Sequence, residues 1–329
     1  MKLKLLTDLS NSETIKNEWD NLVELSNKTI FSKFNFIKNW ADVYSDIAPL
    51  EVYLAYEDGQ LVGIAPFARE DGVLKFAGGI DYKVAADYCD FIVNPLHLDK
   101  VMNEFSQILT ENHSVLHEIP KNSPALDYFR RNNFGRIENS SICSDILLPP
   151  DWESYLRGLD NSRIKKMRYF LNRLERESGE ITYELVEDKT ELGKKMEDFF
   201  EMHQREWADM RGQKGCFADD EKHTRFRKFH KTLAGDFLDD KNLYLSFLKV
   251  DQNIFAVEYS FVDKNSIYGY LGAINPEFHQ YSPGRIRMNF VLKDAILKGI
   301  KKYDFLRGDE PYKEDVYRAN WSNNFKLIT

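Results

Sequence analysis

Cysteine is scarce in this sequence, and the few cysteines lie far apart. Cys89, Cys143 and Cys216 are the only ones in 329 residues, and their spacing matches no zinc-binding pattern. An odd and sparse set is typical of a reducing compartment, where disulfides are rare. We therefore expect neither a disulfide scaffold nor a metal site.

Long apolar runs are absent as well. No stretch approaches the roughly 18 consecutive apolar residues of a membrane-spanning helix. The opening MKLKLLTDLSNSE turns polar after Leu6, which is too short for the apolar core of a signal peptide. Both absences favour a cytoplasmic protein without a transmembrane segment.

The motifs of several enzyme classes are missing. There is no G-x-S-x-G elbow, no Walker A loop and no G-x-G-x-x-G after a strand, and His97, His113 and His117 lack metal-ligand partners. These absences exclude hydrolase, NTPase, dehydrogenase and metalloenzyme interpretations. The formal net charge of -8 also argues against a general nucleic-acid binder.

What is present indicates two α/β domains. Hydrophobic residues at 43% and aromatic residues at 14% suit a packed protein, and 329 residues suffice for two domains. In LLPPDWESY (147–155), two prolines end a strand-like run and Asp151 is placed to cap a new helix. We therefore place the domains at 1–150 and 151–329.

Two segments of the chain resemble each other. VYLAYEDGQLVGIAP (52–66) and LYLSFLKVDQNIFAVEY (243–259) each contain an apolar strand, a turn with Asp and a second strand. Hairpins are common, so chance similarity is one explanation. The other is that the chain consists of two related α/β halves.

The most informative segment is a helix start within residues 268–313. Ser282 stands at an N-cap position, Pro283 at the first helical position and Gly284 next. Such a start offers unpaired N–H groups and a positive dipole end, which suit a pyrophosphate, and Arg285 and Arg287 add positive charge. The alternative is that these residues only begin a well-capped helix.

This segment resembles a known family. The pattern P-x-x-x-x-Y-S-P-G after Asn275, followed by YDFLRGDEPYK (303–313), is similar to the CelD-like branch of the GNAT acyltransferases, which is related to the Fem-type aminoacyltransferases. FSKFNFIKNWADVY, DYCDF, SRIKKMRYFLNRLER and MHQREWADMRGQKGCF extend the resemblance over most of the chain. It implies an α/β fold with mixed sheets, tandem GNAT-like domains with a substrate cleft between or beside them, and an acyl-CoA donor in the second domain.

The mechanism implied by the resemblance is direct attack of an amine on a thioester. Asp304, which lies between Tyr303 and Phe305 in an apolar strand, is the candidate base, because burial raises the pKa of a carboxyl group; alternatively it pairs with Arg307 or caps a neighbouring turn. Lys313 matches a position where Fem-type enzymes place a lysine near the reacting carbonyl, so it is expected to stabilise the oxyanion. Glu310 is a second candidate acid and Glu258 a third, although an isolated acid in a strand often faces solvent.

Other candidates for binding lie elsewhere. From Arg157 to Arg176, seven basic residues stand against two acidic ones, and Arg163 and Lys166 share a helix face that can dock phosphates or remain solvated. His203 and Trp207 are four apart and either line an acceptor pocket or pack in the core. In the first domain, the resemblance directs Asp87, Tyr88 and Asp90 towards the substrate, although Asp87 and Asp90 lie on opposite faces of a regular strand.

The sequence as a whole predicts an N-acyltransferase that uses acetyl-CoA or a longer acyl-CoA. The expected acceptor is a small amine, on a sugar or a cell-envelope precursor that is nucleotide- or lipid-linked. We expect no donor site in the first domain, because FAGGIDYKVAADY (76–88) lacks a capped helix start. The alternatives are an aminoacyl-tRNA donor, for which no insertion is long enough to form a tRNA-binding arm, and a non-catalytic module of a polysaccharide system.

Overall fold

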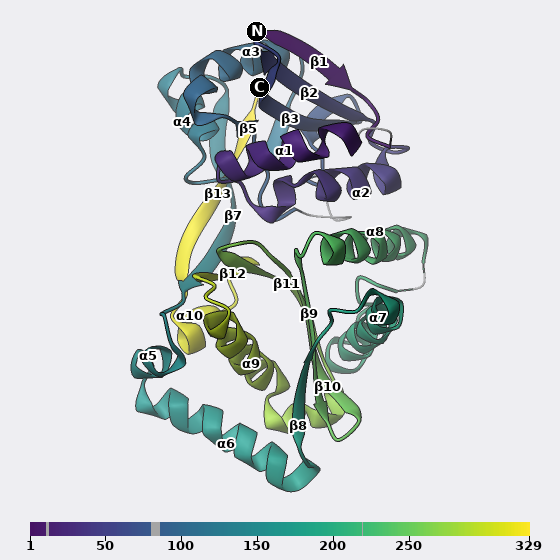
Figure 1. Ribbon diagram of the computed structural model, residues 1–329, viewed down its shortest axis with the longest axis vertical. Helices are drawn as coiled ribbons and strands as arrows, with labels where there is room; N and C mark the ends of the chain where they lie inside the picture. Colours follow the sequence, from purple (N-terminus) through teal and green to yellow (C-terminus); the bar gives the residue numbers. More distant parts are fainter. Residues whose placement is uncertain (11–12, 80–85, 219) are drawn as a thin grey trace. The chain divides into compact units, whose positions relative to one another are not determined.

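The computed structural model describes residues 1–10, 13–79, 86–218 and 220–329 (Figure 1). They form two compact units, Met1–Cys143 with Ser322–Thr329, and Ser144–Trp321. The structure thus differs from the predicted domain 151–329 at its C-terminal end. The last eight residues belong to the first unit, because strand β13 (Asn320–Ile328) pairs antiparallel with β6 (Val115–Pro120).

The first unit combines an antiparallel sheet with helices. Strands β1 to β4 lie side by side in chain order, and β5 pairs with β3. Strand β13 lies between β6 and β7. The elements are β1 (Lys2–Leu6), α1 (Glu13–Leu25), η1 (Ile30–Ser32), α2 (Phe34–Tyr44), β2 (Leu50–Glu57), β3 (Gln60–Glu70), β4 (Val73–Phe76), β5 (Ile92–Val93), η2 (Pro95–His97), α3 (Leu98–Thr110), α4 (Pro124–Arg131) and β7 (Arg136–Leu147), whose last residues enter the second unit.

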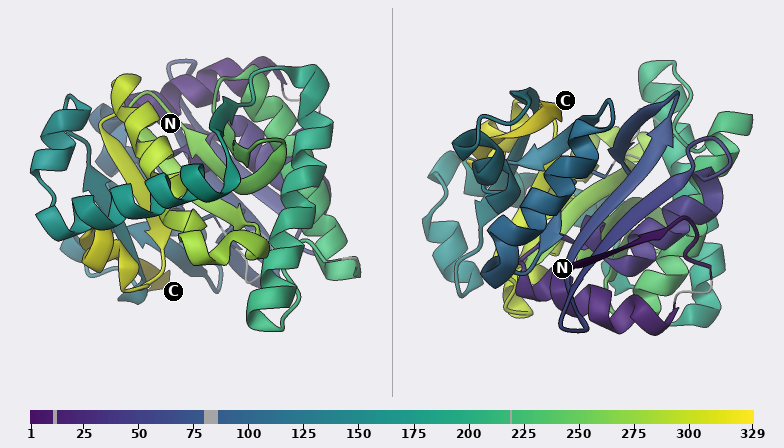
Figure 2. Two further views of the ribbon diagram at one scale, coloured as in Figure 1. Left: turned by 90° about the horizontal axis from the view of Figure 1, so that it is seen from below. Right: turned by 90° about the horizontal axis from the view of Figure 1, so that it is seen from above.

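The second unit contains a mixed sheet in the order β7-β12-β11-β10-β9-β8, with β11 and β12 parallel. Helix α6 crosses α9, as the view from below shows (Figure 2). The elements are α5 (Trp152–Arg157), α6 (Asn161–Ser178), β8 (Ile181–Leu185), α7 (Lys189–Arg211), α8 (Glu221–Asp239), β9 (Leu243–Val250), β10 (Asn253–Val262), β11 (Ser266–Ile274), η3 (Pro276–Tyr281), α9 (Pro283–Leu297), β12 (Lys302–Arg307) and α10 (Tyr312–Tyr317).

The two segments that resemble each other are the hairpins β2–β3 and β9–β10. Asp58 and Gly59 join the first pair with φ values of 49° and 80°, and Asp251 opens the second turn with φ 52°. A short loop with positive φ matches the twist of the strands it joins. In both units the hairpin is followed by a strand, a helix and a second strand that runs parallel to that strand. In the first unit Leu74 of β4 bridges Ser114 in parallel, and in the second unit β11 and β12 pair in parallel. The mixed α/β fold is therefore confirmed.

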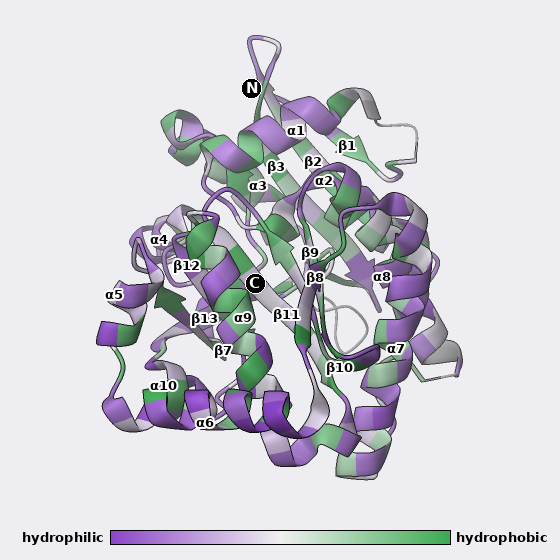
Figure 3. Cartoon of the chain, turned by 60° about the horizontal axis from the view of Figure 1, so that its bottom comes forward, coloured by the Kyte–Doolittle hydropathy of each residue, from purple (hydrophilic) through white to green (hydrophobic). Residues whose placement is uncertain are grey.

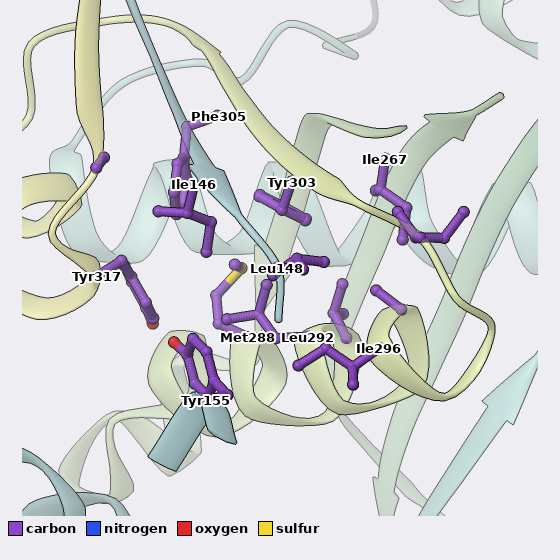
Figure 4. Packing of buried hydrophobic residues seen from close by; sticks show 14 of the residues in the cluster. Ile146, Leu148, Tyr155, Ile267, Met288, Leu292, Ile296, Tyr303, Phe305 and Tyr317 are labelled. Carbon is purple, nitrogen blue, oxygen red and sulfur yellow. The ribbon is translucent and has the colours of Figure 1, made fainter. Parts of the chain in front are cut away.

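The core of the second unit fixes α9 against the sheet. Met288, Leu292 and Ile296, at helical spacing, pack on Ile267 and Tyr303 of the parallel strands (Figure 4). Burying a side chain of this size contributes about 1.5–3 kcal/mol. Helix α9 is therefore held against β11 and β12 by apolar contacts.

The sequence expectation about membranes can also be compared with the structure. Within the residues that the structure describes, each helix is too short or too polar to cross a lipid bilayer.

Candidate functional site

The parallel strands β11 and β12 pair only at their beginnings. Ser266 is paired with Lys302, Ile267 with Tyr303 and Tyr268 with Asp304. In this described part of the sheet the pairing stops there, while β11 continues to Ile274 and β12 to Arg307. Ligands of open α/β sheets bind beyond the carboxyl ends of such strands. Helix α9, which connects the two strands, begins at that end.

The helix α9 begins where the sequence predicts. Ser282 is the N-cap with φ 53°, and its carbonyl accepts hydrogen bonds from the N–H groups of Arg285 (3.0 Å) and Ile286 (3.3 Å). The Ser282 hydroxyl makes no capping bond, and Pro283 has no N–H to satisfy. A Cβ added at Gly284 would meet no atom within 4 Å. The backbone at this helix start is therefore open to a ligand.

A pocket of about 440 Å³ lies beside the first two turns of α9. Its walls include Arg163 and Lys166 of α6 and Arg285 of α9, three cations that the sequence suggested for phosphate binding at separate places. In Figure 3, α6 is drawn mostly in the purple of hydrophilic residues. The lining residues are Tyr155, Leu159, Asp160, Ser162, Arg163, Lys166, Met167, Arg285, Asn289, Asp315, Val316 and Tyr317.

Two tyrosines add hydroxyl groups to this pocket. Tyr155 of α5 and Tyr317 of α10 are 9% and 7% exposed, and their hydroxyl oxygens point towards each other in Figure 4. Burial raises the pKa of both phenols far above their usual value. Both hydroxyls therefore stay protonated and are able to donate hydrogen bonds at neutral pH.

A buried carboxylate lies under β11. Glu258, for which the strand pattern allowed a solvent-facing position, is 1% exposed and accepts hydrogen bonds from the hydroxyls of Tyr303 (2.7 Å) and Ser260 (2.5 Å). The Arg287 guanidinium lies 3.0 Å from its second oxygen and donates to the carbonyl of Val257. Burial opposes the charge on Arg287, but Glu258 together with Tyr303, Tyr312 and Glu206 outweighs it, so the pKa of Arg287 is raised. Arg287 is thus engaged with Glu258.

Two glycines leave room for these side chains. Strand β11 has an extra residue opposite β10, because Tyr259 pairs with Leu271 but Phe261 with Tyr268. This bulge brings Gly269 and Gly272, three positions apart, to the same face of the sheet. A Cβ at Gly269 would overlap the hydroxyl of Tyr303, and one at Gly272 would overlap the guanidinium of Arg287. The spacing GYLG is the sequence signal that could have located this cluster.

The candidate base Asp304 is buried, and its carboxylate already accepts hydrogen bonds from neighbouring residues of the chain. Its carboxylate accepts hydrogen bonds from the Leu306 N–H and the Lys302 ammonium, both at 2.9 Å, and it is 1% exposed. Leu306 has φ 59°, a conformation that such a side-chain bond helps to hold. Asp304 thus caps a turn, which was the alternative suggested by the sequence.

Lys313 and Glu310 secure the loop after β12. The Lys313 ammonium is 2% exposed and donates to the carbonyls of Arg307 and Gly308, both at 3.0 Å, while the Glu310 carboxylate lies 2.9 Å from it. Glu310 itself is 53% exposed. These contacts give both residues a structural role, and their catalytic roles remain predictions.

His203 and Trp207 stack on one face of α7, as their spacing predicts. Their ring centroids are 5.7 Å apart, and His203 is 2% exposed. The Cys216 sulfur lies 3.7 Å from the Nε2 atom of His203. Burial raises the pKa of the Cys216 thiol to about 12, so this pair provides no thiolate nucleophile at neutral pH.

The candidates Asp87, Tyr88 and Asp90 lie in the first unit. The Asp90 carboxylate accepts bonds from Lys28 (2.5 Å) and Ser123 (2.8 Å), which indicates a structural role. The Asp87 carbonyl accepts a bond from Asn324 (2.9 Å), and the Tyr88 ring lies beside Phe31 in a tilted arrangement. These three residues belong to the first unit, whereas the cations around α9 belong to the second.

A metal site was not expected from the sequence. Among the described residues, no group of three or more His, Cys, Asp or Glu side chains is arranged to hold a metal ion.

Comparisons with known proteins agree with this geometry. Residues 161–314 match the sequence profile of the acetyltransferase (GNAT) domain. No curated protein matches the chain. The fold is similar to that of FemX, with a TM-score of 0.66 and 12% identity over 100% of this chain and 98% of that one. It is also similar to L-PGS from Bacillus licheniformis, with a TM-score of 0.60 and 11% identity over 95% of this chain and 91% of that one.

Proposed function

We propose that this chain, whose residues 161–314 match the acetyltransferase (GNAT) domain and whose fold is similar to that of FemX, transfers an acyl group from acyl-CoA to an amine. The donor is acetyl-CoA or a longer acyl-CoA. The acceptor is the amine of a sugar or of another cell-envelope or polysaccharide precursor, carried on a nucleotide or a lipid. The second unit binds the donor, and the first contributes to the acceptor side.

The open start of α9 beside the pocket is the observation that supports this proposal. Gly284 leaves the backbone accessible, and the helix dipole favours an anion there. Arg163, Lys166 and Arg285 add positive charge next to it. Guanidinium groups bind phosphate oxygens in a bidentate way, which suits the phosphate groups of coenzyme A.

The chemistry needs no covalent enzyme intermediate. The neutral amine attacks the thioester carbonyl, the tetrahedral intermediate collapses, and the C–S bond breaks to release the CoA thiolate. The amine loses a proton to a base and the thiolate gains one. Asp304 is our proposed base and Lys313 the proposed oxyanion partner, with Glu310 and the buried Glu258 of β10 as further candidate acids.

Ligand-induced stabilisation tests the donor. A ligand at 100 times its Kd stabilises a protein by about 2.7 kcal/mol, so millimolar CoA and acetyl-CoA are expected to raise Tm by several degrees. Release of free thiol from acetyl-CoA, measured with a panel of amino sugars, then tests transfer. The proposal fails if CoA and its acyl esters leave Tm unchanged.

An aminoacyl-tRNA donor is the second candidate. Lys165 and Arg168 on the outer face of α6 are exposed, and Tyr169 between such cations is 58% exposed. Basic and aromatic side chains side by side are typical of nucleic-acid surfaces. Binding of tRNA whose affinity falls steeply with salt would favour this donor.

A further inference from the structure

The pocket beside α9 lies next to the proposed diphosphate position without coinciding with it. Arg285 and Asn289 line the pocket and are one helical turn apart, a rise of about 6 Å. Gly284, whose backbone is open, precedes Arg285 directly. A ligand bound at the helix start can therefore extend a second group into the pocket.

The charges of the pocket are unbalanced. Among the described residues, Lys166 and Arg285 form no ion pair, and the Arg163 Nε atom lies 3.6 Å from Asp160. Asp160 is already bound by Arg318 from outside the pocket at 2.7 Å. Three cations thus line a pocket with two acids, Asp160 and Asp315, of which Asp160 is already paired with Arg318.

Polar hydrogens in the pocket also lack acceptors. The Arg163 Nη1 atom is buried and has no hydrogen-bond partner among the described residues. The hydroxyls of Tyr155 and Tyr317 are further donors in the same pocket. A buried donor without a partner is destabilising, so such an arrangement indicates an acceptor-rich group that occupies the site.

We propose that this pocket binds a terminal phosphomonoester of the donor, the ribose phosphate of coenzyme A. The inference rests on the proposed acyl-CoA donor and adds a second anchoring point to it. A phosphomonoester carries a charge of about -1.5 to -2 at neutral pH, whereas each phosphodiester of a nucleic acid carries -1. Three cations and two hydroxyl donors match the compact dianion better than a continuous backbone of single charges.

The inference predicts discrimination between two ligands that differ in this phosphate alone. By isothermal titration calorimetry on the full chain, CoA should bind at least tenfold more tightly than dephospho-CoA. Adenosine 3′,5′-bisphosphate should compete with CoA, since it carries the same ribose phosphate. Equal affinity for CoA and dephospho-CoA overturns the inference and leaves the proposed function standing. If neither ligand binds, both are overturned.

Substitutions locate the effect in the pocket. Lys166→Gln removes an exposed cation that lines the pocket, and Arg163→Gln removes a partly buried one. Each should weaken CoA about tenfold and leave dephospho-CoA within about twofold. Lys165→Gln is the matched control, because Lys165 is the exposed neighbour on α6 outside the pocket. A loss that is equal for both ligands, or as large in Lys165→Gln as in Lys166→Gln, overturns the inference.

Discussion

The two units contain the same order of hairpin, strand, helix and parallel strand, but their helices begin differently. At the start of α3, the Glu57 carboxylate bonds to the His97 ring (2.8 Å) and to the Lys100 ammonium, and Asp99 stands in the first turn. The start of α9 has no acidic residue in its first turn and carries Arg285. The start of α3 thus has carboxylates of the protein beside it, whereas the first turn of α9 has none and can accept an external anion. This difference supports donor binding by the second unit alone.

The largest expected effect is on the free energy of unfolding, through the buried ion pair of Arg287 and Glu258 in the second unit. In Gly272→Ala, the new methyl group overlaps the Arg287 guanidinium, which must leave Glu258. Breaking a buried pair costs about 3–5 kcal/mol, so the free energy of unfolding in urea should fall by that amount. Gly284→Ala is the matched control, because its methyl group meets no atom within 4 Å. Equal stability of the two variants would contradict the described packing.

Making α9 resemble α3 should abolish donor binding. Arg285→Glu places an acid in the first turn, as Asp99 does in α3, and removes a cation from the pocket. Loss of a charge-assisted hydrogen bond and repulsion at the helix start should together cost about 2–4 kcal/mol of CoA binding. Calorimetry measures this, with the exposed Lys293→Glu further along α9 as the control. Unchanged CoA affinity in Arg285→Glu would show that the difference between the two helix starts does not determine donor binding.

Acid should weaken the second unit through His230, which lies on α8. Burial lowers the pKa of this imidazole to about 3, whereas an unfolded histidine titrates near 6.5. Between these values the unfolded state binds the extra proton, so stability is complete above about pH 6.5 and declines as the pH falls. The loss should reach roughly 2 kcal/mol at about pH 5.

The variant His230→Phe fits the surrounding rings of Phe217, Phe226 and Phe229 and removes this titration. The difference in urea midpoint between the wild-type protein and this variant should therefore change between pH 7 and pH 5. A difference that is independent of pH would show that His230 is not a buried neutral imidazole.

The smallest effect concerns the carboxylate at the α3 start. Hydrogen bonds from Lys100 and His97 lower the pKa of Glu57. The stabilisation is therefore present above the usual carboxyl range and is lost as the pH falls through the lowered pKa. Glu57→Gln should slightly reduce the loss of folding stability at acid pH and leave CoA affinity unchanged. A gain of a second CoA equivalent in calorimetry would show instead that Glu57 alone closes the first unit to the donor.

Local patterns in the sequence predicted the parts of the site that depend on neighbouring residues. The start of α9 follows from the conformational preferences of Ser282, Pro283 and Gly284, and both hairpins follow from the residues of their turns. The stacking of His203 on Trp207 follows from helical spacing alone. Each of these features involves contacts within a few positions of the chain.

The features that sequence analysis missed depend on distant contacts. An acid in an apolar strand is read as solvent-facing, but Glu258 is covered because the bulge in β11 turns two glycines to its side. The return of β13 to the first unit is a pairing between residues about 200 positions apart, which no local pattern encodes. The prediction that the first domain has no donor site was based on FAGGIDYKVAADY (76–88). Residues 80–85 of this segment lie outside the described residues.

The placement of β13 affects the order in which the protein is built. Translation proceeds from the N-terminus, and early domains usually fold first as they leave the ribosome. Here the earlier unit still lacks its segment Ser322–Thr329, which holds most of β13, when residue 321, the last of the later unit, has been synthesised. The second unit can therefore be complete in the nascent chain before the first unit is. Until Ser322–Thr329 emerge, β6 and β7 lack the strand that lies between them.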